Sequence, residues 1–163
     1  MVNKNSKGIL EKNDIFHNGS TGVEILDNSD PTLCLNRIHN NSKNGVLIYN
    51  DGKGTLEDNK IFENALAGIE IKIRGNPILR RNQICRGMRG GVLIHDQGHG
   101  ILEENEIFGN ALTNVEIADN SDPVLHRNMI HDSKQTGILI NKVVCRNFCN
   151  LDCPVSHPFN LRP

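Results

Sequence analysis

The chain has 163 residues, with 18 lysines and arginines against 19 aspartates and glutamates, and it contains no tryptophan, one tyrosine and five phenylalanines. The near-zero net charge argues against a nucleic-acid-binding surface, which needs a basic excess. The scarcity of aromatic residues argues against stacking platforms for sugars or bases, and against a globular core built on large rings.

A 23-residue repeat runs from Gly8 to Cys145 without a gap. Its six copies, here called rungs, are residues 8–30, 31–53, 54–76, 77–99, 100–122 and 123–145, and positions within a rung are counted from one. A fixed period of this length is typical of a solenoid, in which each repeat packs on the next.

The apolar columns of the repeat favour strands over helices. Positions sixteen and eighteen hold valine or isoleucine in every rung, and this alternation is typical of a strand with one buried face. Position three is always leucine and position eight is always isoleucine. We therefore predict an all-β fold, a right-handed parallel β-helix of about six 23-residue rungs. The strands should lie near positions two to four, seven to nine and sixteen to nineteen.

Position six is asparagine in all six rungs, which indicates a corner of the coil. A buried side-chain amide needs partners for its donors and its acceptor. In a solenoid the same amide lies directly above and below, so each side chain can bond the next and form a ladder. The predicted structural ladder comprises Asn13, Asn36, Asn59, Asn82, Asn105 and Asn128.

The two ends of the chain lie outside the six rungs. Residues 1–7 fit the end of a preceding rung, because Val2 falls on position eighteen, and we expect a fragment or a shortened product. Residues 146–163 do not fit the repeat. This tail either folds over the open end as a cap or is an unstructured addition.

The C-terminal region holds a weak candidate for a zinc site. Four possible ligands recur at every fourth residue, and they are Cys145, Cys149, Cys153 and His157. Zinc ligands are usually spaced as C-x₂-C, and Pro154 would break a helix that aligned these four. We expect reduced, unliganded cysteines, no bound metal and no cofactor.

The outward acids of the third predicted strand do not form a hydrolytic pair. Glu24, Glu70 and Glu116 occupy position seventeen of alternate rungs, so they should be about 9.6 Å apart. A retaining glycosidase needs about 5 Å between its carboxylates, and an inverting one at most about 9.5 Å. We therefore predict no catalytic residues and regard a carbohydrate-active enzyme as disfavoured.

Two acids in predicted turns are a weak candidate for a calcium site. Asp96 and Asp119 share position twenty on neighbouring rungs, with Asn120 and Asp122 close in sequence. A calcium site needs several oxygen ligands, whereas aspartate in turns commonly caps the backbone. We expect no metal at these turns.

A mixed apolar and charged ribbon remains on the outside of the third strands. Exposed leucine and tyrosine side chains on a flat sheet favour a partner surface. The candidate protein-binding face comprises Glu24, Leu26, Leu47, Tyr49, Glu70, Lys72, Leu93, His95, Glu116 and Leu139. The alternative is that a neighbouring segment, or nothing, covers this ribbon.

The repeats resemble those of the F-box only proteins that carry a parallel β-helix as substrate receptor. The resemblance lies in EDNKIFENALAGIEIK (Glu57–Lys72), NPILRRNQI (Asn76–Ile84) and GGVLIHDQGHGILEENEIFGNA (Gly90–Ala111), and it covers residues 8–141. In that family an F-box binds the Skp1–cullin scaffold and the β-helix presents protein substrates for ubiquitin transfer. No F-box segment is present in this sequence, and the tail does not match the zinc finger of some members. The resemblance thus implies a non-catalytic, substrate-binding module.

Two other functions stay open from the sequence. The first alternative is a carbohydrate-binding or polysaccharide-cleaving or epimerising β-helix, and the second is an inert structural spacer. The polar start and the odd count of five cysteines favour a cytoplasmic or nuclear location. We expect a protein substrate of a ubiquitin ligase as partner, and neither nucleic acid nor membrane.

Overall fold

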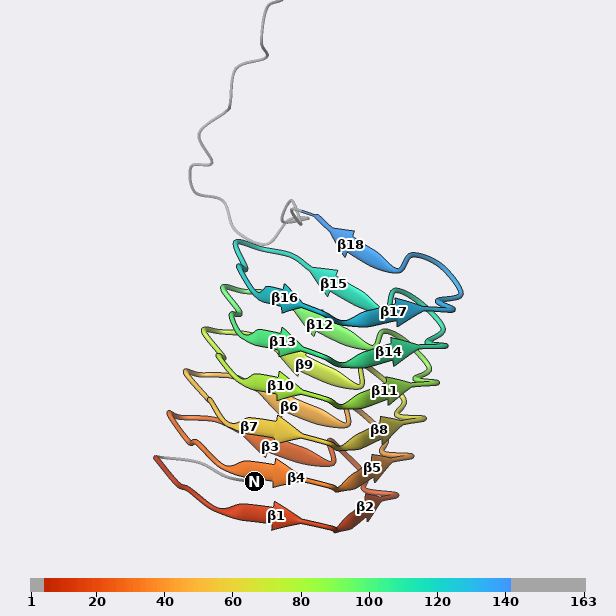
Figure 1. Ribbon diagram of the computed structural model, residues 1–163. Helices are drawn as coiled ribbons and strands as arrows, with labels where there is room; N and C mark the ends of the chain where they lie inside the picture. Colours follow the sequence, from red (N-terminus) through yellow and green to blue (C-terminus); the bar gives the residue numbers. More distant parts are fainter. Residues whose placement is uncertain (1–4, 142–163) are drawn as a thin grey trace, which may run out of the picture.

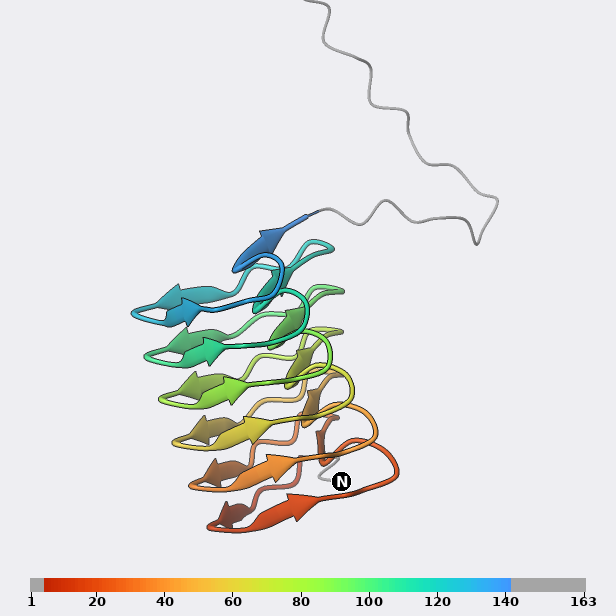
Figure 2. The same cartoon turned by 90° about the vertical axis from the view of Figure 1, so that its right-hand side faces the viewer.

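The computed structural model describes residues 5–141 and confirms the parallel β-helix. Eighteen strands follow one another, three in each rung. Figure 1 shows the six coils stacked along one axis, and Figure 2 shows the same stack from the side. Residues 5–141 contain no helix, and so none that could cross a membrane.

Each strand of a rung pairs in parallel with the equivalent strand of the next rung, which gives three six-stranded sheets. The first sheet contains β1 (Ile9–Glu11), β4 (Thr32–Cys34), β7 (Thr55–Glu57), β10 (Ile78–Arg80), β13 (Ile101–Glu103) and β16 (Val124–His126). The second sheet contains β2 (Asp14–Phe16), β5 (Arg37–His39), β8 (Lys60–Phe62), β11 (Gln83–Cys85), β14 (Glu106–Phe108) and β17 (Met129–His131). The third sheet contains β3 (Val23–Ile25), β6 (Val46–Ile48), β9 (Ile69–Ile71), β12 (Val92–Ile94), β15 (Val115–Ile117) and β18 (Ile138–Ile140).

The register places residues 23 apart directly over one another. Leu33 pairs with Leu56, and Ile48 pairs with Ile71. The core is therefore a set of aliphatic columns, and the side chains of the inner rungs, such as Leu56 and Ile71, are fully buried. The third strand ends at position eighteen, one residue earlier than predicted.

The predicted asparagine ladder is confirmed. The Asn59 side chain donates from Nδ2 to Oδ1 of Asn82 at 2.9 Å and to the Leu33 carbonyl oxygen at 2.8 Å. Its Oδ1 accepts from the backbone N–H of Asn36 at 2.9 Å and from Asn36 Nδ2 at 3.0 Å. The same side-chain bond joins each neighbouring pair from Asn13 to Asn128. Each inner amide of this ladder is thus bonded to its equivalents in the adjacent rungs.

A second, interrupted ladder occupies position eleven. Asn18 donates to Asn41 and Asn41 donates to Asn64, each at 2.9 Å between Nδ2 and Oδ1. Rung four has Gly87 at this position, so the row of hydrogen-bonded side-chain amides stops there. The Gly87 N–H donates instead to Oδ1 of Asn110 at 2.9 Å.

Asn114 replaces a missing member of this second ladder. Rung six has Ser133 at position eleven, so Asn110 instead donates from Nδ2 to Oδ1 of Asn114 at 2.9 Å. Position fifteen is glycine in the other rungs, and in rungs one to four space is short there. A β-carbon on Gly91, for example, would lie 2.5 Å from the Asn114 carbonyl oxygen.

Position nine of the second sheet carries a column of stacked rings. The ring centroids of Phe16 and His39 are 5.2 Å apart, and those of His39 and Phe62 are 4.5 Å apart. Phe108 and His131 stack at 5.1 Å, and the buried Cys85 interrupts the column in rung four. His39 and His131 thus take the place of phenylalanine in this column.

The corners of the coil force many residues into left-handed backbone conformations. At position twenty, Asp27, Asn50, Asp96 and Asp119 have φ between 50° and 54°. Asparagine and aspartate tolerate this region, whereas a β-branched side chain does not. Ile73 occupies the same position with φ of 47°, so its backbone is strained.

The ends of the chain are described only in part. The Asn5 N–H donates to the Asp27 carbonyl oxygen and the Asp30 N–H donates to the Ser6 carbonyl oxygen, both at 2.9 Å. The interpretation of residues 1–7 as a partial rung stays a prediction. The possible cap formed by the tail and the weak zinc ligands Cys145, Cys149, Cys153 and His157 lie outside the described residues.

Removal of one inner amide should weaken the whole stack. We expect Asn59→Ala to lower the free energy of unfolding by about 2–5 kcal/mol, because it removes side-chain bonds to three residues and leaves the buried N–H of Asn36 without its acceptor. Urea denaturation followed by circular dichroism measures this. Asn13→Ala is the matched control, since its side chain donates a single ladder bond at the partly exposed end. An equal loss in both variants would contradict the cooperative role of the ladder.

Relief of the strained corner should stabilise the protein. We expect Ile73→Asn to raise the free energy of unfolding by about 0.5–1 kcal/mol, because asparagine accepts the left-handed region and the isoleucine side chain is 37% exposed. The midpoint of thermal unfolding reports the change. Ile73→Val keeps the β-branch and should give no gain, and a gain of the same size with valine would refute the explanation by strain.

Candidate functional site

The outer face of the third sheet carries the ribbon that the sequence singled out. In β3, β6, β9 and β12 the middle residue lies between two buried neighbours and is itself half-buried. The middle residues of the six strands are Glu24, Leu47, Glu70, Leu93, Glu116 and Leu139. Glutamate and leucine therefore alternate up this face, as predicted from position seventeen.

Position nineteen, just past the strand, departs from the prediction at one residue. Leu26 is buried, with 8% of its surface exposed, so its assignment to an exposed face is wrong. The chain turns directly after β3, where the Ser29 N–H donates to the Leu26 carbonyl oxygen at 3.2 Å. The equivalent turn bond follows Tyr49, Lys72 and His95 in the next three rungs, yet these side chains are half-buried, so the turn alone does not account for the burial of Leu26.

Glu70 on β9 is the centre of a polar cluster on this face. Its Oε1 accepts hydrogen bonds from Lys72 Nζ and His95 Nε2, both at 2.9 Å. Its Oε2 accepts from Asn44 Nδ2 at 2.6 Å. Nδ1 of His95 lies 3.0 Å from Oδ2 of Asp96. These contacts join rungs two, three and four.

The cluster fixes the protonation of its two central groups. Burial alone would raise the pKa of Glu70, but hydrogen bonds from His95, Lys72 and Asn44 outweigh it and lower the pKa from 4.5 to about 2. The hydrogen bond to Glu70 raises the pKa of His95 against the effect of burial, and the charge of Asp96 adds to the rise. The bond between the two groups thus lowers the pKa of the Glu70 carboxyl and raises the pKa of the His95 imidazole.

A cleft of about 260 Å³ opens beside this cluster. Its lining residues come from rungs two to five and include Glu70, Leu93 and Glu116 of the third sheet, with Arg89 and Thr113 from the loops that precede it. Arg89 is exposed and forms no ion pair with any residue between 5 and 141. The cleft thus combines two carboxylates, an apolar surface and an uncompensated guanidinium.

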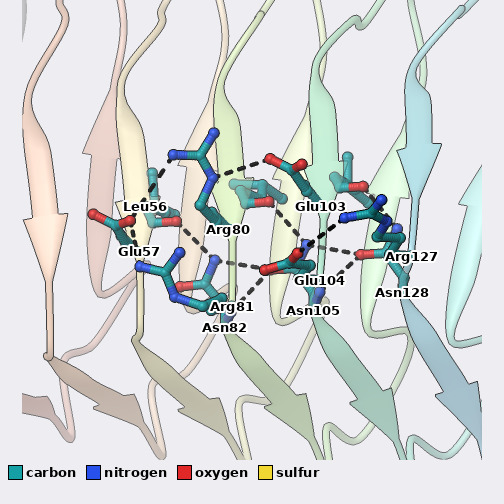
Figure 3. A network of polar contacts seen from close by, with 12 residues as sticks. Leu56, Glu57, Arg80, Arg81, Asn82, Glu103, Glu104, Asn105, Arg127 and Asn128 are labelled. Atoms are coloured by element: carbon teal, nitrogen blue, oxygen red, sulfur yellow. Dashed lines mark hydrogen bonds and ion pairs between the residues drawn. The ribbon is translucent and has the colours of Figure 1, made fainter.

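The charged residues of the first sheet, in contrast, neutralise one another. Arg80 lies between two acids of the adjacent rungs, with Nε 3.0 Å from Oε2 of Glu103 and Nη1 4.0 Å from Oε1 of Glu57 (Figure 3). Arg81 donates two hydrogen bonds of 3.0 Å to the Asp58 carboxylate. Because these charges already have partners, this surface is a weaker candidate for ligand binding than the cleft.

The turn acids that sequence analysis set aside lie next to a histidine. His95, Asp96 and Asp119 each offer one possible ligand atom, and these three atoms lie within 4.8 Å of one another. Asp122 is bonded to His99 instead. The group was not predicted, because His95 was assigned only to the outer ribbon. The signal was the 24-residue spacing from His95 to Asp119, which is one rung plus one residue.

Comparison with known families identifies the repeat. The family model for the right-handed beta helix region matches residues 1–71 and, again, residues 36–153. The chain belongs to this family. Membership of the F-box proteins is not part of that match, and comparison with curated proteins gives no match.

Two solved structures share the right-handed beta helix. The A-module of the mannuronan C-5 epimerase AlgE4 from Azotobacter vinelandii is 18% identical, with a TM-score of 0.74 over 81% of this chain and 38% of the epimerase chain. The periplasmic alginate epimerase AlgG is 18% identical, with a TM-score of 0.57 over 82% of this chain and 39% of that chain. The chain thus spans less than two fifths of either protein. At this identity the likeness establishes the fold alone.

These two structures overturn one expectation from the sequence. A non-catalytic module was predicted and carbohydrate-active enzymes were disfavoured, but both solved structures that share this beta helix are carbohydrate-active enzymes. The prediction was wrong because it tested only the carboxylate spacing that glycoside hydrolysis requires. An epimerase inverts a carbon centre without hydrolysing a glycosidic bond. The distance between the carboxylates therefore does not exclude an epimerase.

The depressed pKa of Glu70 predicts an acid-sensitive contribution to stability. The folded value of about 2 lies below the unfolded value of about 4.3. Ionised Glu70 therefore stabilises the fold above about pH 4.3, and this contribution is lost as the pH falls towards 2. After allowance for solvent screening it amounts to about 1–2 kcal/mol.

Urea denaturation of the wild type and of Glu70→Gln, from neutral pH to about pH 2, tests this. The difference in free energy of unfolding should shrink as the pH falls. Glu24→Gln is the matched control, because Glu24 has the same position in rung one and makes no side-chain hydrogen bond with any residue between 5 and 141. A difference for Glu70→Gln that does not change with pH would contradict the assigned ion pairing.

Proposed function

We propose that this right-handed beta helix is a carbohydrate-active protein that binds an acidic polysaccharide along the outer face of its third sheet. The observation that supports the proposal is the cleft beside Glu70, with carboxylates, apolar side chains and the uncompensated Arg89 in one cavity. Its lining residues come from consecutive rungs, so the cleft extends along the coil axis. A linear polymer can follow this direction.

The size and chemistry of the cleft suit a sugar unit. Its volume of about 260 Å³ is near the lower end of ligand pockets. Glu70, Glu116 and Thr113 offer oxygen atoms to sugar hydroxyl groups, and Leu93 offers an apolar surface to the carbon-bearing face of a ring. The absence of tryptophan leaves aliphatic side chains for this second role.

Arg89 favours a polymer that carries carboxylates. A guanidinium binds a carboxylate through two parallel hydrogen bonds, which gives both charge neutralisation and orientation. Because no acid in residues 5–141 pairs with Arg89, a uronate group of the polymer supplies the missing partner. The proposed ligand class is therefore a uronic-acid polysaccharide.

Proton transfer beside the cleft would involve His95 rather than Glu70. A general base works best when its pKa lies near the working pH, and the pKa of Glu70 is about 2. The pKa of His95 is raised by its bond to Glu70, whereas burial and Glu24 raise the pKa of Tyr49 further from neutral pH, which disfavours Tyr49 as a base. In this scheme Glu70 is a positioning residue that orients the imidazole.

Recognition of protein substrates for ubiquitin transfer is a second candidate function. It is supported by the resemblance of the repeats to F-box receptors and by the half-buried Leu47, Leu93 and Tyr49 on the same face. Burial of Leu26 reduces the apolar surface that a protein partner would cover. The geometry therefore favours the polysaccharide.

Binding to defined polymers tests the proposal. We expect the chain to bind polymannuronate or polygalacturonate but not neutral dextran, and we expect Arg89→Ala to weaken binding at least about tenfold, because a charged hydrogen bond is lost. Isothermal titration calorimetry measures the affinity. Deuterium incorporation at the carbon next to the uronate carboxylate, followed by proton NMR, detects proton transfer, and His95→Gln should abolish it.

Arg127→Ala is the matched control for Arg89, because Arg127 is an exposed arginine that pairs with Glu104 and belongs to the first-sheet side of the coil. It should leave the affinity unchanged. Equal binding by wild type and Arg89→Ala would refute the role of Arg89. Failure of every acidic polymer to bind would refute the proposed function and leave protein recognition as the role of this face.

A further inference from the structure

We infer that His95, Asp96 and Asp119 form a binding site for a divalent transition-metal ion at the edge of the third sheet. Their ligand atoms lie within 4.8 Å of one another. A metal held at about 2.0–2.2 Å from nitrogen and oxygen ligands separates those ligands by about 3.4 Å in tetrahedral geometry. Small side-chain rotations of the two aspartates are enough to close the site.

The orientation of His95 is an independent indication of a metal ligand. Nε2 of His95 donates to Oε1 of Glu70 at 2.9 Å, which leaves Nδ1 directed at Oδ2 of Asp96, 3.0 Å away. Histidines that bind metals usually donate their other ring N–H to a carboxylate in this way, which fixes both tautomer and ring orientation. Glu70 is outside the ligand group and is itself held by Lys72 and Asn44.

The backbone holds the two aspartates one rung apart. Asp96 and Asp119 occupy the same corner position, with φ of 50° and 51°. The Gln97 N–H donates to the Asp119 carbonyl oxygen at 3.0 Å, and the Gly98 N–H donates to the His95 carbonyl oxygen at 3.0 Å. The spacing of the carboxylates is therefore set by the coil, and little ordering is required when a metal binds.

The ligand set selects the type of ion. One imidazole and two carboxylates suit Zn²⁺ or Mn²⁺, whereas Ca²⁺ requires six to eight oxygen ligands. Three protein ligands leave a coordination position for water or for a ligand oxygen. The site shares Glu70 with the cleft and His95 with the proposed proton transfer, so a metal on Nδ1 and a proton taken up by Nδ1 exclude one another; metal binding itself does not depend on a polysaccharide.

Titration of the full chain with Mn²⁺, in the absence of any saccharide, tests the inference. Mn²⁺ prefers carboxylate and imidazole to the thiols of this chain, and its electron paramagnetic resonance signal reports the free ion. We expect one ion per chain. Asp119→Asn and His95→Gln should each weaken binding at least about tenfold, and Glu70→Gln should weaken it about 10- to 100-fold through loss of the carboxylate charge that raises the basicity of the imidazole.

His131→Gln is the matched control. His131 also lies beside two carboxylates, with Nδ1 2.8 Å from Asp132 and Nε2 3.6 Å from Glu106, but it is on the second sheet. Its substitution should leave Mn²⁺ affinity unchanged. Circular dichroism verifies that each variant folds, and Asp119→Glu, which keeps the carboxylate, should retain more affinity than Asp119→Asn.

Zn²⁺ provides a second probe by isothermal titration calorimetry. Here Cys145, Cys149 and Cys153 are replaced by serine so that the tail thiols cannot supply ligands. Binding of one Zn²⁺ that is lost in His95→Gln supports the site. If the chain binds neither ion, or if His95→Gln and Asp119→Asn bind like the parent chain, the inference is overturned. Because no saccharide is present, this result is separate from the test of polysaccharide binding.

Discussion

The bond between equivalent side chains of successive rungs is the interaction on which the structure depends. A rung of this coil has neighbours only above and below it, so each buried polar group must find its partner in the same column. Asn59 meets this condition by accepting from Asn36 and donating to Asn82. A shift of one residue in any rung would remove these bonds and turn the apolar face of each strand outward. The constant 23-residue period is the consequence.

Strict stacking also determines where function can arise. Columns that repeat without change, such as the leucines and isoleucines of the core, build the scaffold. Chemistry appears where an outward column varies, because unlike groups then lie one coil apart. Glu70, Lys72 and His95 meet in this way at positions seventeen and nineteen, and Leu93 lies between Glu70 and Glu116 in the same column.

The sequence predicted the features that depend on a constant column and missed those that depend on an exception. The six asparagines at position six predicted a ladder that the structure confirms. The second ladder was missed because Gly87 and Ser133 break its column. The polar cluster around Glu70 was missed because Glu70 was compared only with acids of its own column, whereas His95 lies one rung and two residues away. The burial of Leu26 was missed because it is an exception within its column, where the equivalent Tyr49, Lys72 and His95 are half-buried.

The interrupted ladder makes the coil mechanically uneven. The corner at position six is continuous through all six rungs. At the corner after the second sheet, Gly87 ends the amide chain in rung four, and Cys85 interrupts the ring column in the same rung. There the exposed Arg86 joins Glu63 of rung three at 3.3 Å, and exposed ion pairs add little. At rung four this corner therefore lacks an amide-to-amide bond and is held by backbone bonds, such as that from the Ala111 N–H to the Gly87 carbonyl oxygen at 3.0 Å, which makes it the softer of the two corners.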